Sequence, residues 1–555
     1  MRGRRYRLRA PGAELTLGDI AKGRGIEDIA AFTRPSMRDL ADPCVLEDMD
    51  IAAVRLADAL AKRERILVFG DYDVDGACST SIIVRFCRLM GHDADYFIPD
   101  RIEHGYGPSP KALADAKADE YDLVIFVDCG TAASGVIEGM TADVLIVDHH
   151  KPHGDLPAVF ACVNPHRDDD SSGLGMLCAA GLAFMLCIAA RRTLRTNGGF
   201  ALSEEPDLRG LLDLVAIATV ADVVPLVGAS RLLLAAGLAI LDRAPSPGPK
   251  ALMDVAGVSE VTAGRLGFAL GPRINAAGRV GRGSGFDGGA KGVALLLSED
   301  GTEAAILASE LNGLNAERQE IEQQALEEAL RDAEKQVDDG ARIICVWSRD
   351  WHPGVVGIVA GRVRERFDRP AIVGSSDGET IKASGRSVPG FDLGQLVIEA
   401  RSQGFLSSGG GHAAACGLGC LEASWSDLRA FLHDHASWEP KPVAIDCRAA
   451  ARRLNVPHTE ALDLLQPFGQ GNPSVSCILE GFEVCEVKAF GQGHVRLLSA
   501  RKDLEVLFWR AESEGLAYQL SQLRGQVISV VGVPKINEWN GRKKVSFEAS
   551  DVLLS

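Results

Sequence analysis

The chain has 555 residues, 46% hydrophobic content and a formal net charge of −17, which describe a globular protein of several domains. The acidic balance argues against a protein that coats nucleic acid, although a local basic groove would still be compatible with it. No apolar run approaches the roughly 20 residues that cross a bilayer, and the basic N-terminus lacks the apolar segment of a secretory signal. Because the thirteen cysteines show no framework spacing, we expect reduced thiols and a cytoplasmic location.

The first strongly patterned stretch lies at residues 66–90, after a basic arm that we expect to be disordered and a helix near 51–62. Residues 66–69 are apolar and predict a buried strand, and Gly76 opens an apolar helix. Three carboxylates stand between them at alternate positions: Asp71, Asp73 and Asp75. Acids confined between a strand and a helix repel one another, and a divalent cation with oxygen ligands would offset that repulsion.

Two other interpretations of the alternating acids are an acidic helix cap and a calcium loop. An EF-hand loop needs a bidentate Glu at its twelfth position, and the twelfth residue from Asp71 is Ile82. The EF-hand is therefore excluded, whereas the capping interpretation stays open on these residues alone.

Two further apolar strands also end in polar side chains. Residues 122–127 are followed by Asp128, and residues 144–147 are followed by Asp148, His149 and His150. Ligands of an open α/β sheet bind at the carboxyl ends of its strands, so these side chains are expected to meet. Imidazole beside carboxylates favours Mn²⁺, and the oxygen atoms would also accept Mg²⁺.

The remainder of the first half alternates strands and helices and then becomes mainly helical. Strands are predicted near 66–70, 94–98, 122–127, 143–147 and 159–163, which indicates a mostly parallel sheet with helices on both faces. Asp222 ends a helix predicted over 208–221. Residues 271–279 are predicted to form a glycine-flanked loop whose two arginines and amide suit a phosphate backbone.

The second half begins with a long polar helix over 298–340, whose glutamates leave no continuous apolar face. Residues 341–437 again alternate strands and helices. The glycine-rich run 407–412 is predicted to be a flexible loop that opens a helix and binds an anion. Residues 441–555 predict short strands of a small barrel, which would bind single-stranded nucleic acid by stacking. The candidate groove residues are Phe490, His494, Arg496, Phe508, Trp509 and Lys535.

Several of these motifs together resemble the DHH phosphoesterase superfamily, and the first motif is most similar to its RecJ family of single-strand-specific exonucleases. The resemblance is carried by Gly70–Gly76, Val127–Gly130, Val147–His150, Ala218–Leu226 and Ser408–His412. It implies an α/β fold class with an N-terminal segment (1–64), a DHH-type parallel-sheet catalytic domain (65–297), a long connector helix (298–340), a second α/β domain of DHHA1 type (341–440) and a C-terminal OB-fold barrel (441–555).

The resemblance also implies roles for individual residues. The metal ligands would be Asp73, Asp75, Asp128, His149 and Asp222, with Asp128 between two ions. Asp71 and Asp148 would orient ligands, and His150 would face the phosphate. The substrate contacts would be Arg101, Tyr106, Asn164, Arg273, Asn275, Ser384, Arg386, Ser408, Gly410, Gly411 and His412. For Asn164, support of the metal ligands is the alternative role.

The implied activity is 5′→3′ digestion of single-stranded DNA to mononucleotides with two divalent cations, Mn²⁺ favoured and Mg²⁺ accepted, in DNA repair and recombination. Expected partners are single-stranded DNA, a helicase and a single-stranded-DNA-binding protein, with no membrane. One alternative is another DHH activity, such as a phosphodiesterase for very short oligonucleotides. A different class is an inactive nucleic-acid-binding scaffold, which the complete ligand set disfavours.

Overall fold

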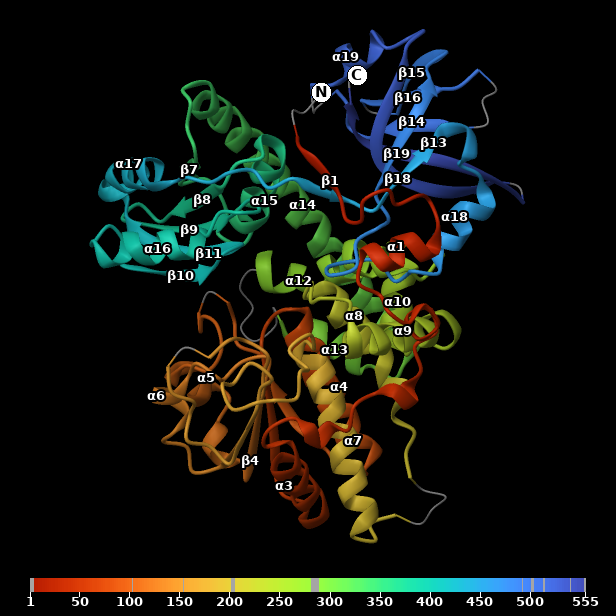
Figure 1. The fold of residues 1–555 in the computed structure, drawn as a ribbon. Coiled ribbons are helices and arrows are strands. Elements are labelled where there is room, and N and C mark those ends of the chain that lie inside the picture. Colours follow the sequence, from red (N-terminus) through yellow and green to blue (C-terminus); the bar gives the residue numbers. More distant parts are fainter. Residues whose placement is uncertain are drawn as a thin grey trace. The chain divides into compact units, whose positions relative to one another are not determined.

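The computed structural model describes residues 4–553 except 102, 153, 201–204, 281–288, 492, 501–503, 513–514 and 540 (Figure 1). The chain forms two compact units. We call Pro35–Glu320 with Pro467–Asn472 the N-terminal unit, and Met1–Arg34, Ile321–Gln466 and Pro473–Ser555 the C-terminal unit. Over the described ranges, no helix combines the length and the apolar character needed to span a membrane.

The N-terminal unit is built on a five-stranded parallel sheet, as the sequence predicted, and its strand order is β3-β2-β4-β5-β6. Its strands are β2 (Ile66–Gly70), β3 (Asp95–Phe97), β4 (Leu123–Val127), β5 (Asp143–Val147) and β6 (Ala161–Val163). Successive residues enter different cores: Val68 belongs to one cluster of buried side chains and Phe69 to another. The sheet is therefore buried on both faces, which explains its continuous apolar strands.

Helices cover both faces of this sheet. They are α3 (Met49–Lys62), α4 (Val74–Leu89), α5 (Pro110–Asp115), α6 (Ser134–Ile137), α7 (Ala179–Thr196), α8 (Leu212–Ala221), α9 (Gly228–Arg243), α10 (Pro247–Ala256), α11 (Ala263–Arg265), α12 (Gly271–Val280) and α13 (Ala290–Leu297). Side chains of α3, α4 and α7 share the core that contains Val68, while α5 and α6 contribute to the core around Phe69. Figure 1 shows α3, α4 and α7 beside the sheet that contains β4.

The expected loop at 271–279 is wrong, because these residues form helix α12. Pro272 stands in the first turn, where a proline is tolerated, and Ile274, Ala276 and Ala277 are buried along the helix. The glycines that suggested a loop allow close packing instead. A Cβ on Gly278 would lie 3.2 Å from the backbone oxygen of Tyr72.

The long helix α14 (Gly301–Asp338) occupies the place predicted for it. The expected lack of a continuous apolar face is confirmed, because the buried polar residues Asn315, Arg318 and Glu322 separate two stretches of small apolar side chains that are buried at three- and four-residue spacing. These are Ala304, Ala308 and Leu311 in the N-terminal unit and Ala325, Ala329 and Ala333 in the C-terminal unit. Alanine contributes so little hydrophobicity that the glutamates around it hide the stripe in the sequence.

The C-terminal unit contains a second, mixed sheet in the order β10-β11-β9-β8-β7. Its elements are β7 (Ile344–Ser348), α15 (Val356–Phe367), β8 (Ala371–Ser376), β9 (Thr380–Arg386), α16 (Leu393–Ser402), β10 (Ser408–His412), β11 (Ala415–Leu421) and α17 (Trp425–His435). The expected glycine-rich loop and following helix are wrong, because both segments are strands of a hairpin. The hairpin needs glycine: Gly411 has a φ of +152°, and a Cβ there would lie 2.4 Å from the Ala415 oxygen.

The last part of the chain forms a seven-stranded sheet in the order β13-β14-β18-β19-β17-β16-β15. Its elements are β13 (Cys447–Ala450), α18 (Val456–Asp463), β14 (Cys477–Glu483), β15 (Glu486–Phe490), β16 (His494–Leu498), β17 (Glu505–Phe508), α19 (Ala517–Ser521), β18 (Val527–Trp539) and β19 (Arg542–Leu553). The sequence also predicts one strand over 476–490, which the structure divides into β14 and β15. It predicts a turn at 540–541 as well, and Asn540 lies outside the described residues.

The N-terminal arm is not disordered where it is described. Strand β1 (Tyr6–Leu8) pairs in parallel with β12 (Val443–Ile445), and α1 (Leu17–Gly23) and α2 (Ile29–Thr33) follow. Asp446 fixes this arrangement, because its buried carboxylate lies 2.9 Å from Arg24 Nε and 3.1 Å from Arg9 Nε. The first 34 residues thus belong to the C-terminal unit, whereas the helix predicted near 51–62 is α3 of the N-terminal unit.

We expect Asp446→Ala to destabilise the C-terminal unit by about 3–5 kcal/mol, because it leaves the buried guanidinium of Arg24 without its carboxylate. Chemical denaturation followed by tryptophan fluorescence would measure the change. Asp254→Ala is the control, since it removes an exposed ion pair with Lys250 and should cost less than about 1 kcal/mol. Equal effects of the two substitutions would contradict the anchoring role of Asp446.

Candidate metal centre

The polar side chains after the strands meet because the strands end at one level. Gly70 pairs with Val127, Val127 with Val147, and Val147 with Val163. The next residue of each strand therefore emerges at the same sheet edge, and these residues are Asp71, Asp128, Asp148 and Asn164. This register confirms the expected meeting of acidic strand ends.

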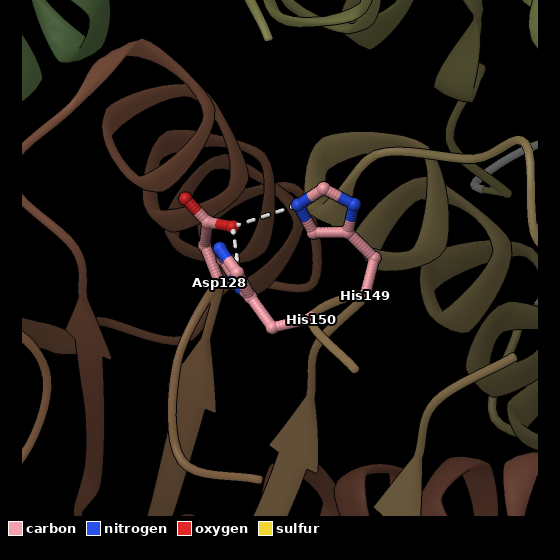
Figure 2. A group of neighbouring side chains, drawn as sticks. All are labelled: Asp128, His149 and His150. Carbon is pink, nitrogen blue, oxygen red and sulfur yellow. Dashed lines mark ion pairs between the residues drawn. The ribbon is translucent and has the colours of Figure 1, made fainter. Parts of the chain in front are cut away.

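Three groups of side chains at this edge could each hold a cation, since one ligand atom from every member lies within 4.8 Å of the others. The groups are Asp128, His149 and His150; Asp75, His149 and Asp222; and Asp71, Asp73 and Asp128. Figure 2 shows both imidazoles directed at one carboxylate oxygen of Asp128. That oxygen lies 3.3 Å from His149 Nε2 and 3.8 Å from His150 Nδ1.

Two of the acids are held by the first turns of helices. Asp73 caps α4, and its Oδ1 accepts hydrogen bonds from the amides of Asp75 (2.8 Å) and Gly76 (3.1 Å). The carboxylate of Asp75 accepts from the amides of Ala179 (2.7 Å) and Ala180 (2.8 Å) at the start of α7. Helix N-termini stabilise negative charge, so the backbone favours both carboxylates where they stand. The capping interpretation of Asp73 is thus correct and compatible with a ligand role.

Another carboxylate that faces the His149 imidazole comes from the end of a helix. Asp222 follows the last residue of α8, and its Oδ2 lies 3.5 Å from His149 Nε2. The same imidazole nitrogen is 3.6 Å from Asp75 Oδ2. His149 therefore faces three carboxylates with one nitrogen, a geometry that suits a shared cation more than three separate hydrogen bonds.

Burial makes this concentration of carboxylates unfavourable without a positive charge. Burial, followed by repulsion from Asp73, raises the pKa of Asp75 to about 7. Burial, followed by repulsion from Asp75, raises the pKa of Asp222 to about 9 and that of Asp128 well above its usual value. The pKa of Asp71 is likewise raised by burial and then by Asp73.

The donor set fits a divalent cation. Among the described residues, three buried polar atoms at the sheet edge lack a hydrogen-bond partner: Asp71 Oδ1, Asp128 Oδ1 and His149 Nε2. Burial and the neighbouring His150 lower the pKa of His149 to about 4, which leaves its imidazole neutral with a free lone pair. Carboxylate oxygens with a neutral imidazole match the ligand preferences of Mn²⁺, and the oxygens those of Mg²⁺.

His150 is held in place by its neighbours. Asp148 Oδ1 accepts from the amides of His149 (2.7 Å) and His150 (3.0 Å) and lies 2.8 Å from His150 Nδ1. Burial opposes the charged imidazolium, but the hydrogen bond to Asp148 and the charges of Asp148, Asp222 and Asp71 together outweigh it and raise the pKa of His150 to about 9. The hydroxyl of Tyr106 lies 3.0 Å from the same ring and donates to the backbone oxygen of Asp128 (3.1 Å).

Asn164 has the contacts of a residue that supports the ligands, which is one of the two roles expected for it. It is fully buried, and its amide donates to Thr131 Oγ1 (3.0 Å) and to the backbone oxygen of His150 (2.8 Å). The amide oxygen accepts from the backbone of His166. Asn164 therefore fixes the loop that carries the histidines.

Basic side chains lie beside the acidic centre. The guanidinium of Arg101 stands 4.6 Å from the ring centroid of Tyr72, and Tyr72 meets Tyr106 edge-on at 6.5 Å. Burial, followed by repulsion from Arg101, lowers the pKa of Arg279 to about 10. Both arginines of the glycine-flanked motif suited a phosphate in the sequence, and the resemblance singled out Arg273, whereas the structure brings Arg279 near Arg101 and Asp73. Two crowded guanidiniums at this place could bind an anion.

Arg273 and Asn275, the two substrate contacts implied by the resemblance within that motif, lie on α12. Arg273 is already engaged, because its Nε donates to Asn312 Oδ1 (2.9 Å) and its Nη1 to the Ala269 oxygen (2.6 Å). Asn275 is half-buried on the same helix. These contacts give Arg273 a structural role within the N-terminal unit.

In the C-terminal unit, the predicted anion-binding residues form a row across three strands. His412 pairs with Ala415, and Ala415 pairs with Arg386. Ser384 lies on the same strand as Arg386, and a Cβ on Gly357 in α15 would lie 3.3 Å from both side chains. Ser408 is four residues from His412, about 13 Å along an extended strand, so these residues do not form the single loop expected. Gly410 and Gly411 lie between them on the same strand.

The seven-stranded sheet carries an aromatic cluster. The rings of Phe490, His494 and Trp509 meet edge-on with centroids 5.0–5.6 Å apart, and the guanidinium of Arg496 lies 5.6 Å from the Phe490 centroid. Trp509 is 45% exposed, as a stacking surface requires. Phe508 was expected in the groove but is buried in the core, because neighbouring residues of a strand face opposite sides.

Three family models match the chain: the DHH family N-terminal domain over residues 65–219, the DHHA1 domain over 339–438 and the RecJ OB domain over 445–551. The single-stranded-DNA-specific exonuclease RecJ of Dickeya dadantii is 35% identical over 97% of this chain and 97% of its own length. The Bacillus subtilis RecJ is 35% identical over 95% of this chain and 66% of its length. The chain belongs to the RecJ family.

Solved structures agree with this assignment. The crystal structure of RecJ from Thermus thermophilus in complex with Mn²⁺ has a TM-score of 0.79 and 29% identity, covering 97% of this chain and 75% of that one. The complex of the same protein with Mg²⁺ has a TM-score of 0.73 and 28% identity. The predicted DHH, DHHA1 and OB organisation is thereby confirmed.

We expect Mn²⁺ to stabilise the protein, because cation binding removes the repulsion among the buried carboxylates. At a concentration about 100 times its dissociation constant, the ion should add about 2.7 kcal/mol to the free energy of unfolding. Thermal unfolding with Mn²⁺ or with EDTA would measure this, and Asp128→Asn should abolish most of the difference. Asp119→Asn, an exposed acid of the same unit, should keep it; a Mn²⁺ effect that survives Asp128→Asn would contradict the site.

Proposed function

We propose that this protein is a single-stranded-DNA-specific exonuclease that digests from the 5′ end and releases mononucleotides in DNA repair and recombination. The observation that carries the proposal is the group of acids and histidines at the sheet edge, in a chain of the RecJ family. The class of reaction is hydrolysis of phosphodiester bonds with divalent cations. The number of ions (two), the preference for Mn²⁺ over Mg²⁺ and the polarity are parts of the proposal.

The ligand assignment follows the three groups. Asp73, Asp75, Asp128, His149 and Asp222 would hold the ions, and Asp128 would lie between them because it belongs to two groups. Asp71 and His150 also belong to candidate groups, so both stand close enough to bind metal. When bound, two such ions would activate a water molecule and stabilise the departing 3′-oxygen.

The remaining polar residues would bind and orient the DNA. Asp148 holds the ring of His150, and Tyr106 supports it from the other side, so that His150 can donate to a phosphate oxygen. Arg101 and Arg279 would bind the 5′-phosphate, since their mutual repulsion is relieved by an anion. The residues Ser384, Arg386, Gly410, Gly411 and His412 would form a second phosphate site in the C-terminal unit.

The aromatic cluster of the OB domain would bind the bases of the single strand without sequence preference. A helicase that supplies the strand and a single-stranded-DNA-binding protein are the proposed partners. We also propose a cytoplasmic location. Twelve of the thirteen cysteines are buried or half-buried as free thiols, as expected of a reducing compartment.

We expect a single-stranded oligonucleotide with Mn²⁺ to lose mononucleotides from its 5′ end, and Asp128→Ala to abolish this, because that carboxylate belongs to two ligand groups. A label at either end gives the polarity. A 5′ tail should be removed while a blunt duplex resists.

Three results would contradict this proposal. Cleavage of very short oligonucleotides alone would indicate the short-substrate phosphodiesterase. Equal digestion of tail and blunt duplex would remove the single-strand specificity. An absence of both Mn²⁺ binding and cleavage would favour the inactive scaffold.

The 5′-phosphate contact has its own test. Arg101→Ala should slow digestion of a 5′-phosphorylated strand by about tenfold or more, the value of one charge-assisted contact, and leave a 5′-hydroxyl strand nearly unchanged. Initial rates at subsaturating DNA would measure both. Arg209→Ala, which removes an exposed arginine paired with Asp207, is the control. If Arg101→Ala slowed the two substrates equally, the phosphate role would be lost.

A further inference from the structure

The turn that follows Asp222 has an unfavourable backbone conformation. Helix α8 ends at Ala221, Asp222 is its C-cap, and Val223 has a φ of +59°. A left-handed conformation is uncommon for a β-branched residue and persists only when surrounding contacts hold it. The position of Asp222 is also unfavourable electrostatically, since a helix C-terminus repels a carboxylate. Something beyond α8 must therefore hold this acid in place.

A segment from far along the chain lies against this turn. Residues Pro467–Asn472, between α18 and β14, belong to the N-terminal unit although the residues on both sides of them do not. The backbone oxygen of Gln470 accepts a hydrogen bond from the Leu226 amide at 2.7 Å. Gly469 and Asn472 exchange backbone hydrogen bonds of 2.9 and 3.2 Å, which close the segment into a tight turn. We call Pro467–Asn472 the clasp.

The clasp fits closely on Pro225 and Leu226. A Cβ on Gly471, whose φ is +73°, would lie 3.1 Å from Pro225 Cβ, and one on Gly469 would lie 2.6 Å from Leu226 Cδ1. Both glycines are thus needed for the approach of the two turns. Leu226 is buried, so the contact forms part of the interior of the unit.

Two buried polar side chains anchor the clasp. The backbone oxygen of Pro467 accepts from Asn472 Nδ2 at 2.9 Å and from Arg231 Nη1 at 3.2 Å. Arg231 lies on α9, directly after the turn, and both side chains are 3% exposed. Helix α9 therefore follows the turn directly and also provides the arginine that donates a hydrogen bond to the clasp.

We infer that the clasp is a positioning element for Asp222. It holds Pro225 and Leu226 in place, so that Val223 cannot relax to a negative φ. Such a relaxation would reorient the end of α8, where Asp222 stands. The carboxylate of Asp222 then stays 3.5 Å from His149 Nε2, where the second ligand group requires it. This inference rests on the proposed role of Asp222 as a metal ligand, and it gives a segment of the C-terminal region a part in metal binding.

The test compares two full-length glycine variants. Gly471→Val pushes against Pro225, whereas Gly481→Val has the same left-handed strain (φ +71°) but no neighbour within 4 Å. Calorimetric titration should show Mn²⁺ affinity reduced by about 10- to 100-fold in Gly471→Val, the usual effect of removing support from a ligand, and unchanged in Gly481→Val. The Mn²⁺ concentration for half-maximal digestion should shift with it, while the rate at saturating Mn²⁺ changes far less.

A milder pair covers the case in which Gly471→Val lowers the unfolding temperature far more than Gly481→Val does. Arg231→Met removes the hydrogen bond to the Pro467 oxygen but keeps a side chain of similar volume, and it should weaken Mn²⁺ binding about tenfold. Arg231→Lys keeps a donor and should recover most of that loss. If folded Arg231→Met and folded Gly471→Val bind Mn²⁺ like the unmodified protein, the clasp has no positioning role.

Asp222→Asn separates this inference from the proposed function. Weak Mn²⁺ binding in Asp222→Asn together with normal binding in the clasp variants would overturn the inference and leave the function intact. Normal Mn²⁺ binding in Asp222→Asn would show that Asp222 is not a metal ligand. The clasp would then have no ligand to position.

Discussion

The main physical constraint on the N-terminal unit is the repulsion among the carboxylates that the fold places at one sheet edge. The stability of the unit depends on how this repulsion is compensated. Asp71, Asp75 and Asp128 are nearly inaccessible to water, so the solvent does little to screen their charges. A fold that buries such a cluster is stable in the charged state only with compensating positive charge. A divalent cation supplies more charge in that volume than a side chain could, which is why the geometry favours metal binding over an ion-pair network.

The backbone compensates part of this repulsion, but unequally. Asp73 and Asp75 accept hydrogen bonds at the first turns of α4 and α7, where helix dipoles favour negative charge. Asp222 stands at the opposite end of a helix, and its neighbour Val223 has a positive φ. Asp128 also has a positive φ, of 62°. Left-handed conformations thus occur at one acid of the centre, Asp128, and at the residue directly after another, Asp222, and a well-packed interior on both faces of the sheet maintains them.

The basic groups show how an acidic protein can accept DNA. The total charge of −17 includes the carboxylates that a cation would neutralise. Arg101 and Arg279 stand at the edge of the acidic centre, and the desolvation of Arg279 strengthens its interaction with an anion. If DNA binds here as proposed, the local field at this place matters more than the total charge of the chain.

The sequence by itself determined the parallel sheet and the meeting of Asp71, Asp128 and Asp148, because apolar strands of one level must present their next residues at one edge. It also indicated the long helix and the families of all three domains, since these follow from local patterns and motifs. Only the tertiary structure showed which glycines allow close packing between elements and which form loops. The motif at 271–279 is a helix and Ser408–His412 is a strand, because glycine permits a loop and a close approach equally well. Burial likewise favoured the supporting role of Asn164 and removed Phe508 from the aromatic surface, and contacts between distant residues brought Arg279 near Arg101 and revealed the clasp. Such contacts depend on which segments the fold brings together, and local sequence does not contain that information.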